Sequence, residues 1–240
     1  MTAPLVRRSP THSAQVVATT ELTPRMRRVT VRAESMRHAV LRPAQDVELL
    51  LREPSGRRVK RRYTISAART EVGELDLDVL LHGDGPGSRW GEAAVIGDEV
   101  EFQGPRGKLE LRSALHHLLV GDESALPAIV AICTALGDSE TSTAVIEVRD
   151  ESDEMPVPAT DVRWVHRHDA AAGRPDLLAD ALALVTPPPG SRGYLMGESR
   201  AMIALRSLLE ARGVEHDAIF VKGYWNLGRP DRLANRPPSA

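Results

Sequence analysis

The 240-residue chain contains a single cysteine, Cys133. One thiol cannot form a disulfide within the chain, and it cannot supply the several cysteine ligands of an iron–sulfur cluster or a structural zinc site. Cys133 lies in an apolar run, so we expect it to behave as a small core residue. Any redox chemistry in this chain therefore has to depend on other groups.

The chain also lacks a strong charge bias and a long hydrophobic run. Its formal net charge is -2, which argues against nonspecific capture by nucleic acid or by an anionic membrane. No apolar run approaches the roughly 20 residues of a membrane-spanning helix, and no signal-peptide pattern follows the basic, polar start. We therefore expect a cytoplasmic monomer with no nucleic-acid partner and no stable membrane association.

Residues of the first half alternate between apolar and polar types. The pattern is clearest at 29–31, 47–51, 75–79 and 100–102, and a period of two is typical of half-buried antiparallel strands. Glycine and proline separate these runs, which favours a small β-barrel or sandwich. We assign residues 1–112 to this β domain.

From about residue 113 onward, short β-rich runs alternate with helical patterns. This alternation predicts a doubly wound α/β domain over 113–240, with a parallel sheet covered on both faces. Such sheets bind nucleotides at the carboxyl ends of their strands, and an adjoining barrel could hold a second, flat cofactor against that edge. We expect an irregular tail from residue 229. Strands are expected at 117–120, 143–148, 161–165, 193–196 and 218–221, and helices at 126–133, 176–185 and 199–212.

The first candidate site is the basic and aromatic stretch Arg61-Arg62-Tyr63-Thr64, on an expected strand. In a functional interpretation, Arg61 neutralises a pyrophosphate, Tyr63 lies along a planar cofactor, and Thr64 hydrogen-bonds that cofactor. The alternative is an ordinary strand with an exposed basic rim. The stretch alone does not decide between the two.

A glycine-rich stretch follows further along the chain, with the sequence HGDGPGSRW. Its small residues and the helix expected after them could cradle a phosphate, because backbone N–H groups at a helix start point toward an anion. A turn between two strands would have a similar composition. The candidate ligands are His82, Gly85, Gly87, Ser88 and Trp90.

Three stretches of the second half lie at expected strand ends. Residues 121–128 join a strand to a helix without the glycine spacing of a dinucleotide fingerprint, although the helix start still suits a pyrophosphate. Residues 197–200 repeat that junction, and residues 223–228 place two aromatic side chains beside glycines in a chain that is only 3% aromatic. The candidate ligands are Asp122, Ser124, Ala125, Gly197, Glu198, Tyr224 and Trp225.

Taken in order, these stretches resemble the siderophore-interacting proteins, a family of FAD-dependent ferric-siderophore reductases related to the ferredoxin-reductase fold. The resemblance covers nearly the whole chain and includes the stretches Gly104–Gly107 and Trp164–Arg167. It departs from the family pattern at Ser66, where the family often has an arginine. Arg62 or Arg69 could replace that phosphate contact.

The resemblance implies an activity as well as a fold. FAD would bind to the barrel, and NADH or NADPH would dock on the second domain and deliver hydride to it. Electrons would then pass to a ferric siderophore or another ferric chelate, and reduction would release Fe(II), because hard oxygen donors favour the trivalent ion. No catalytic acid–base residue and no metal site is expected, since His166 and His168 lack the spacing and carboxylate partners of one.

Basic side chains could also attract an anionic ferric chelate. Lys60 and Arg62, from the basic run at 57–62, and Lys222 are the candidate substrate ligands, although such charges are also common on ordinary solvated surfaces. Two rival functions stay open from the residues alone. One is a flavin reductase with a different acceptor, and the other is a non-catalytic module that binds flavin or siderophore.

The sequence leaves the choice between NADH and NADPH open. Arg149 and Arg167 would favour the 2′-phosphate of NADPH, whereas the acidic residues at 150–154 would repel it and accept hydrogen bonds from a ribose diol. Neither the siderophore nor the nucleotide can be named from the residues.

Overall fold

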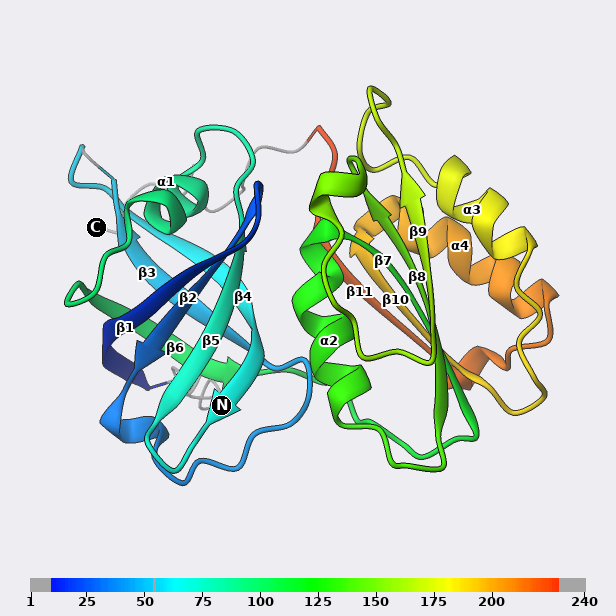
Figure 1. Cartoon of the computed structure of the whole chain (residues 1–240), viewed down its shortest axis with the longest axis horizontal. Helices are drawn as coiled ribbons and strands as arrows, with labels where there is room; N and C mark the ends of the chain where they lie inside the picture. Colours follow the sequence, from blue (N-terminus) through cyan, green and yellow to red (C-terminus); the bar gives the residue numbers. More distant parts are fainter. Residues whose placement is uncertain (1–9, 54, 229–240) are drawn as a thin grey trace, which may run out of the picture.

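The computed structural model describes residues 10–53 and 55–228, which form a β-barrel and an α/β domain side by side (Figure 1). The tail expected from residue 229 lies outside the described residues. The predicted boundary after residue 112 falls between the last barrel strand, β6 (Glu99–Arg106), and the first strand of the parallel sheet, β7 (His116–Asp122).

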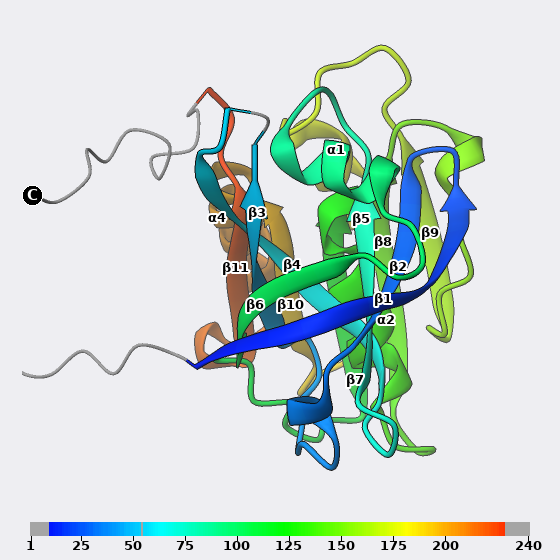
Figure 2. The same cartoon turned by 90° about the vertical axis from the view of Figure 1, so that its left-hand side faces the viewer.

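The barrel closes through six antiparallel strands in the order β1-β2-β5-β4-β3-β6 (Figure 2). Alternate side chains point inward, and Val29, Leu49, Leu77 and Phe102 are fully buried in its core. The predicted barrel is confirmed. Its other strands are β1 (Thr11–Thr23), β2 (Met26–Arg32), β3 (Asp46–Arg52), β4 (Arg58–Arg69) and β5 (Glu74–Leu80).

A short helix, α1 (Pro86–Ala93), lies over one end of the barrel (Figure 1). Its last carbonyls have no partner within the helix, and Arg27 of β2 satisfies several of them. The Arg27 guanidinium donates to Gly91 O at 2.8 Å and to Ala94 O at 3.1 Å. The glycine-rich stretch therefore starts a helix that is fixed to the barrel wall.

The α/β domain contains a five-stranded parallel sheet in the order β11-β10-β7-β8-β9. Helix α2 lies between the sheet and the barrel, and α3 and α4 cover the opposite face (Figure 1). Both faces are therefore apolar, which confirms the predicted doubly wound sheet. The remaining elements are β8 (Thr141–Val148), β9 (Asp161–His166), β10 (Arg192–Glu198), β11 (Ile219–Trp225), α2 (Leu126–Thr134), α3 (Asp176–Ala183) and α4 (Ser199–Ala211).

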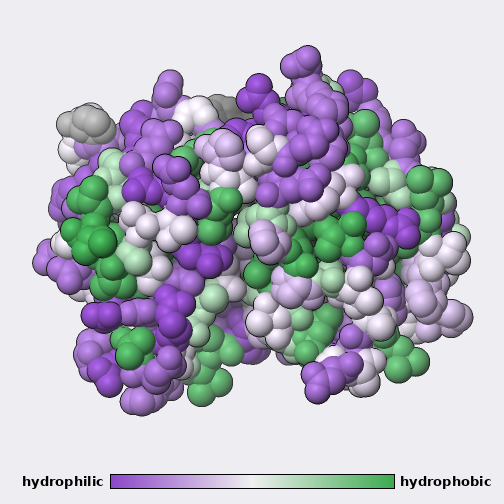
Figure 3. All heavy atoms as spheres, viewed as in Figure 1, coloured by the Kyte–Doolittle hydropathy of each residue, from purple (hydrophilic) through white to green (hydrophobic). Residues whose placement is uncertain are grey.

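The surface shows no single dominant apolar region on the face drawn in Figure 3, where hydrophobic side chains are scattered among hydrophilic ones. The most exposed large apolar side chains, Val40, Leu115 and Leu184, come from three separate segments. Among the described residues, no helix is both long and apolar enough to cross a membrane.

Candidate functional site

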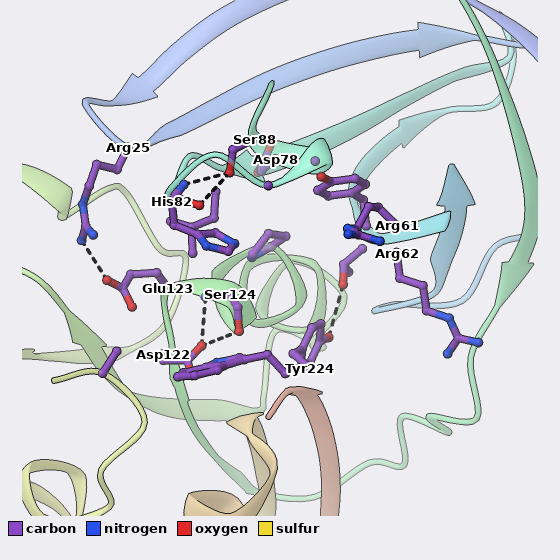
Figure 4. Close-up of a pocket in the computed structure, with 18 of the residues that line it drawn as sticks. Arg25, Arg61, Arg62, Asp78, His82, Ser88, Asp122, Glu123, Ser124 and Tyr224 are labelled. Carbon is purple, nitrogen blue, oxygen red and sulfur yellow. Dashed lines mark hydrogen bonds and ion pairs between the residues drawn. The ribbon is translucent and has the colours of Figure 1, made fainter. Parts of the chain in front are cut away.

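A cavity of about 770 Å³ is lined by residues of both domains. Figure 4 shows Ser88 and His82 of the barrel facing Asp122 and Tyr224 of the α/β domain across it. Most of the predicted ligands converge here from four separate stretches of sequence. The predicted residues that line the cavity are Lys60, Arg61, Arg62, Tyr63, Thr64, His82, Gly85, Gly87, Ser88, Asp122, Ser124, Tyr224 and Trp225.

On the barrel side, Tyr63 of β4 is the central aromatic residue. Its ring packs against Trp90 of α1, with centroids 5.9 Å apart and planes tilted by 38°. Gly87 lies so close that a Cβ atom there would run into the Tyr63 hydroxyl. Burial raises the pKa of Tyr63, so its hydroxyl stays neutral. Trp90 does not line the cavity and instead supports the Tyr63 ring from behind.

The loop before α1 is closed by its own hydrogen bonds. Ser88 Oγ accepts from His82 N and donates to His82 O, both at 3.0 Å. Ser88 is 3% exposed, so this hydroxyl is committed to the loop rather than to a ligand. The two ends of the glycine-rich stretch are thereby held together, with Gly85 and Gly87 between them.

The basic run is partly neutralised by Glu48 of β3. Lys60 Nζ and Arg106 Nη2 each lie 2.8 Å from Glu48 Oε2, and Arg62 Nε lies 3.6 Å from its other oxygen. Burial would raise the pKa of Glu48, but hydrogen bonds from Lys60 and Arg106 outweigh it and lower that pKa. Lys60 is therefore already paired, whereas the Arg62 side chain is 61% exposed.

Ser66, the departure from the family pattern, lies inside the barrel wall and donates to Asp76 O at 3.2 Å. Arg69 cannot replace the missing arginine at the cavity, because its guanidinium is bound to Asp76 and Glu74. Of the two candidate replacements only Arg62 lines the cavity.

On the α/β side, one buried carboxylate organises three strand ends. Asp122, at the end of β7, accepts from the Glu198 amide at 3.1 Å and from Trp225 Nε1 at 2.8 Å. Its other oxygen accepts from the Ser124 amide at 3.0 Å and from the Ser124 hydroxyl. Burial raises the pKa of Asp122, although the donors around it favour the ionised form. Asp122 thus fixes Ser124 and Trp225 at the cavity wall.

Four predicted ligands of this domain do not line the cavity. Glu198 caps α4 by accepting from the Arg200 and Ala201 amides at 2.7 and 2.8 Å. Gly197 has φ +153° and no room for a Cβ atom, which would lie 2.6 Å from Asp122 Oδ2. Ala125 is fully buried. Lys222 is bound to Asp46 at 3.0 Å, with its ammonium 4.8 Å from the Tyr224 ring centre.

One of the direct contacts between the two walls joins two predicted ligands. Thr64 Oγ1 of β4 donates to the Tyr224 hydroxyl of β11 at 3.2 Å (Figure 4). Burial raises the pKa of Tyr224, so it too stays protonated. The two residues lie far apart in sequence, and this contact places an aromatic ring of the second domain at the predicted cofactor stretch of the first.

Sequence reasoning did not anticipate a charged cluster at the cavity edge. Arg25, in the turn between β1 and β2, donates to Glu123 at 2.8 Å and to Asp153 at 2.5 Å. Arg167 lies 2.5 Å from Glu123 and 3.6 Å from Glu147. Glu123 and Arg167 lie inside stretches already singled out, whereas nothing marks Arg25 in the sequence. The other unpredicted lining residues are Glu48, Asp78, Leu80, Pro127, Ala172 and Asn226.

The barrel wall fits a flavin dinucleotide. Tyr63 offers an aromatic face, Arg61 and Arg62 supply guanidinium groups suited to a pyrophosphate, and Gly87 lets the start of α1 approach the Tyr63 hydroxyl closely. The opposite wall lies at the carboxyl ends of parallel strands, where sheets of this kind bind nucleotides. Each domain therefore contributes one binding wall to the cavity.

Comparisons with known proteins agree with this geometry. The family model described as "Siderophore-interacting protein" matches residues 114–228, and the "Siderophore-interacting FAD-binding domain" matches residues 52–109. The chain is 31% identical to the ferric vibriobactin reductase ViuB of Vibrio cholerae over 185 residues, which is 73% of this chain and 68% of that protein.

Solved structures give the same result. A siderophore utilization protein from T. fusca superimposes with a TM-score of 0.83 at 30% identity, covering 92% of this chain and 94% of that one. The siderophore-interacting protein SipS from Aeromonas hydrophila superimposes with a TM-score of 0.79 at 24% identity, with the same coverage, and supports the fold alone.

Proposed function

Because the chain belongs to the siderophore-interacting protein family, we propose that it is a cytoplasmic FAD-dependent oxidoreductase that uses NADH or NADPH to reduce a ferric siderophore or another ferric chelate. The observation that carries this proposal is the shared cavity. Its barrel wall presents Arg61, Tyr63 and Thr64, and its other wall presents Ser124 and Tyr224 at the strand ends of a nucleotide-binding type of sheet.

A bound FAD would supply the step from a two-electron donor to a one-electron acceptor, which Fe(III) requires. The residues of the chain would bind and orient this cofactor. Arg61 and Arg62 would neutralise the pyrophosphate and Tyr63 would pack against the ring system. Thr64, whose hydroxyl donates to Tyr224, would accept a hydrogen bond from the polar edge of the ring system, and Tyr224 would shield the same region from water. No residue has to transfer a proton to iron, so no acid–base pair is needed.

The substrate is proposed to reach the cavity at its basic rim. Arg62 is the most exposed of the basic residues that were predicted as substrate ligands, at 61% against 44% for Lys60 and 24% for Lys222. Each nicotinamide nucleotide gives two electrons, so two Fe(III) ions are reduced for each nucleotide oxidised. Siderophore oxygen donors hold Fe(II) more weakly than Fe(III), and the chelate then releases the ion.

The proposal is tested in three steps on the purified protein. Mass spectrometry of the released cofactor identifies the flavin, and FAD rather than FMN is expected. NADH or NADPH should then bleach the flavin absorbance without oxygen. Finally, the reduced protein is mixed with a panel of ferric chelates, and a ferrous-specific dye counts the product, with two Fe(II) expected per nucleotide oxidised.

Each rival function predicts a different result. A flavin reductase with another acceptor would take up FAD and be reduced, but no ferric chelate would reoxidise it faster than buffer does. A non-catalytic module would bind flavin or siderophore without any bleaching by either nucleotide. FMN as the sole cofactor would contradict the role given to the dinucleotide pyrophosphate.

A further inference from the structure

A group of side chains suited to metal binding lies at the edge of the parallel sheet, outside the cavity. Glu151 lies in a 3-10 turn (Glu151–Asp153) that follows β8, His166 ends β9, and His168 comes two residues later. One ligand atom from each of these three residues lies within 4.8 Å of the others. The carboxylate partners that the sequence did not show for the two histidines are therefore present in the fold.

The parallel pairing of β8 and β9 explains why these residues meet. Val148 is paired with His166, so the segments that follow the two strands leave the sheet together. Two backbone bonds extend the pairing, from Arg167 N to Val148 O at 3.0 Å and from His168 N to Arg149 O at 2.7 Å. The histidines are therefore attached to the same backbone frame as the turn that carries Glu151.

His168 has a φ of 50°, in the left-handed region that only a few per cent of non-glycine residues adopt. This conformation leaves its ring centre 5.8 Å from that of His166. Histidine is enriched several-fold in this region, and at this position the conformation places two potential ligands side by side.

Two carboxylates flank the His166 ring. Glu154 Oε1 lies 2.8 Å from His166 Nε2, and Glu151 Oε1 lies 3.7 Å from His166 Nδ1. In metal sites, a carboxylate on one ring nitrogen commonly orients the histidine so that the other nitrogen can coordinate the ion. Glu154 is placed for that orienting role, and Glu151 lies on the coordinating side.

We propose that Glu151, His166 and His168 bind a divalent first-row transition-metal ion and that Glu154 orients His166. Two imidazoles and one carboxylate select ions such as Zn²⁺, Co²⁺ and Fe²⁺ over Mg²⁺ and Ca²⁺, which prefer oxygen ligands alone. The donor set leaves coordination positions open for water or another ligand.

The side chains have to move closer together around an ion. Ligand atoms at about 2.1 Å from a tetrahedral metal lie roughly 3.4 Å apart, which is less than the 4.8 Å span of this group. The Glu151 side chain is 70% exposed and His168 is also exposed, so both can rotate without disturbing the core. The cost of ordering two exposed side chains makes us expect an affinity in the micromolar range.

The site is next to the cavity but distinct from it. Arg167, between the two histidines, lines the cavity, whereas neither histidine does. The proposed metal site does not depend on reductase activity, because an ion can bind whether or not the chain reduces iron. Fe(II), the product of the proposed reaction, belongs to the class of ions that this site would bind. Only this connection between the site and the reaction rests on the proposed function.

Titration of tag-free protein with Co²⁺ tests the proposal, because coordinated Co²⁺ absorbs visible light. We expect one ion per chain, displaced by Zn²⁺ and, under anaerobic conditions, by an excess of Fe²⁺, which binds such sites more weakly than Co²⁺, but not by millimolar Mg²⁺. His166→Gln and His168→Asn should each weaken binding at least tenfold. Asparagine tolerates the left-handed backbone, so His168→Asn removes the ligand with little change of conformation.

His38→Asn is the matched control, because His38 is also exposed and also has a left-handed backbone, with φ 56°. It should leave Co²⁺ binding unchanged. The proposal is overturned if wild-type protein shows no saturable binding, if His166→Gln and His168→Asn bind as the control does, or if Mg²⁺ competes equally. Glu154→Gln separates the two roles, since loss of an orienting carboxylate should weaken binding less than loss of His166. None of these results bears on flavin reduction.

Discussion

At the scale of single residues, Asp122 determines how the second wall of the cavity is arranged. It accepts four hydrogen bonds, two from Ser124, one from the Glu198 amide and one from Trp225. All four partners are donors, so the site requires a side chain that only accepts. This need explains an acidic residue at a position that is almost completely buried.

Asp122→Asn tests this requirement. The amide group keeps the size but turns a donor toward two donors, and at least one buried N–H loses its partner, at a cost of about 1–3 kcal/mol. Asp150→Asn is a matched control, because Asp150 accepts from the amide and hydroxyl of Ser152 in the same way but is more exposed. Urea unfolding should show the larger loss for Asp122→Asn. Equal losses would contradict the role given to Asp122.

Gly87 is the second residue with a requirement that can be tested. A methyl group there would collide with the Tyr63 hydroxyl, so Gly87→Ala should displace the ring and weaken FAD binding at least several-fold. Gly137→Ala adds a methyl group that meets nothing closer than Glu140 at 3.4 Å. Fluorescence titration of the apoprotein with FAD measures both affinities. If Gly87→Ala binds FAD as tightly as Gly137→Ala, Tyr63 is not held where the cofactor lies.

At the scale of elements, the sequence predicted the α/β domain better than the barrel. The run at 143–148 became β8 (Thr141–Val148), and the helix predicted at 199–212 became α4 (Ser199–Ala211). Strands buried on both faces are continuous apolar runs, which are easy to find. β1 (Thr11–Thr23) was missed, because only three of its side chains are buried and they do not alternate regularly.

The site was predictable where topology alone brings its residues together. Strand ends gather at one edge of a parallel sheet, so Asp122 and Trp225 could be placed from their positions in the chain. The partner of Lys222 could not be predicted, because Asp46 of the barrel lies far away in sequence and such a pair leaves no trace in local sequence. Glu198 accepts from the Arg200 and Ala201 amides, two and three residues along the chain, but glutamate is not among the residues that usually mark a helix cap.

Glu147 of β8 predicts how the stability of the folded protein depends on pH. Burial raises its pKa to about 7 from an ordinary value of 4.5, although Arg167 lies nearby. The folded protein therefore binds more protons than the unfolded chain between these pH values. The stabilising contribution of protonated Glu147 is complete below pH 4.5 and is lost as the pH rises through 7, to an extent of about 3 kcal/mol.

Glu147→Gln should remove this dependence, because glutamine resembles the protonated form. The unfolding free energy of the variant relative to wild type should therefore rise between pH 4.5 and 8. Glu140→Gln is the control of opposite sign. Hydrogen bonds from Gly137, Ser113 and Ala114 lower the pKa of Glu140 to about 2, so its contribution is lost only in acid and its difference curve should be flat above pH 5. A flat curve for Glu147→Gln would contradict the prediction.

At the scale of the whole molecule, polar contacts connect the two walls of the cavity. Thr64 donates to Tyr224, Asp46 of the barrel binds Lys222, and Arg25 binds Glu123 and Asp153. These contacts lie around the cavity, whereas α2 packs against β4 between the domains. These contacts therefore fix the position of one wall relative to the other, and they do so next to the place where the proposed ligands would bind.

The same network bears on the choice between NADH and NADPH. Arg167 is 91% buried and is paired with Glu123 at 2.5 Å, so in this arrangement it is not presented to a 2′-phosphate. Asp153 is also neutralised, by Arg25. The remaining exposed charges after β8 are Arg149, 55% exposed and 3.8 Å from Asp150, Glu151, 70% exposed, and Glu154, which lies 2.8 Å from His166. Arg149 would attract a 2′-phosphate, and the two glutamates would repel it.

We therefore expect NADH to be used at least as well as NADPH, with kcat/KM values within about tenfold of each other. The measurement uses one ferric chelate and both nucleotides, first with wild type and then with Arg149→Gln. If Arg149 contacts the 2′-phosphate, its loss lowers kcat/KM for NADPH and leaves the value for NADH unchanged. A wild-type preference for NADPH beyond a hundredfold, worth about 2.7 kcal/mol, would contradict the prediction. It would require the Arg167 pairs to open when the nucleotide binds, since the buried guanidinium cannot otherwise reach the phosphate.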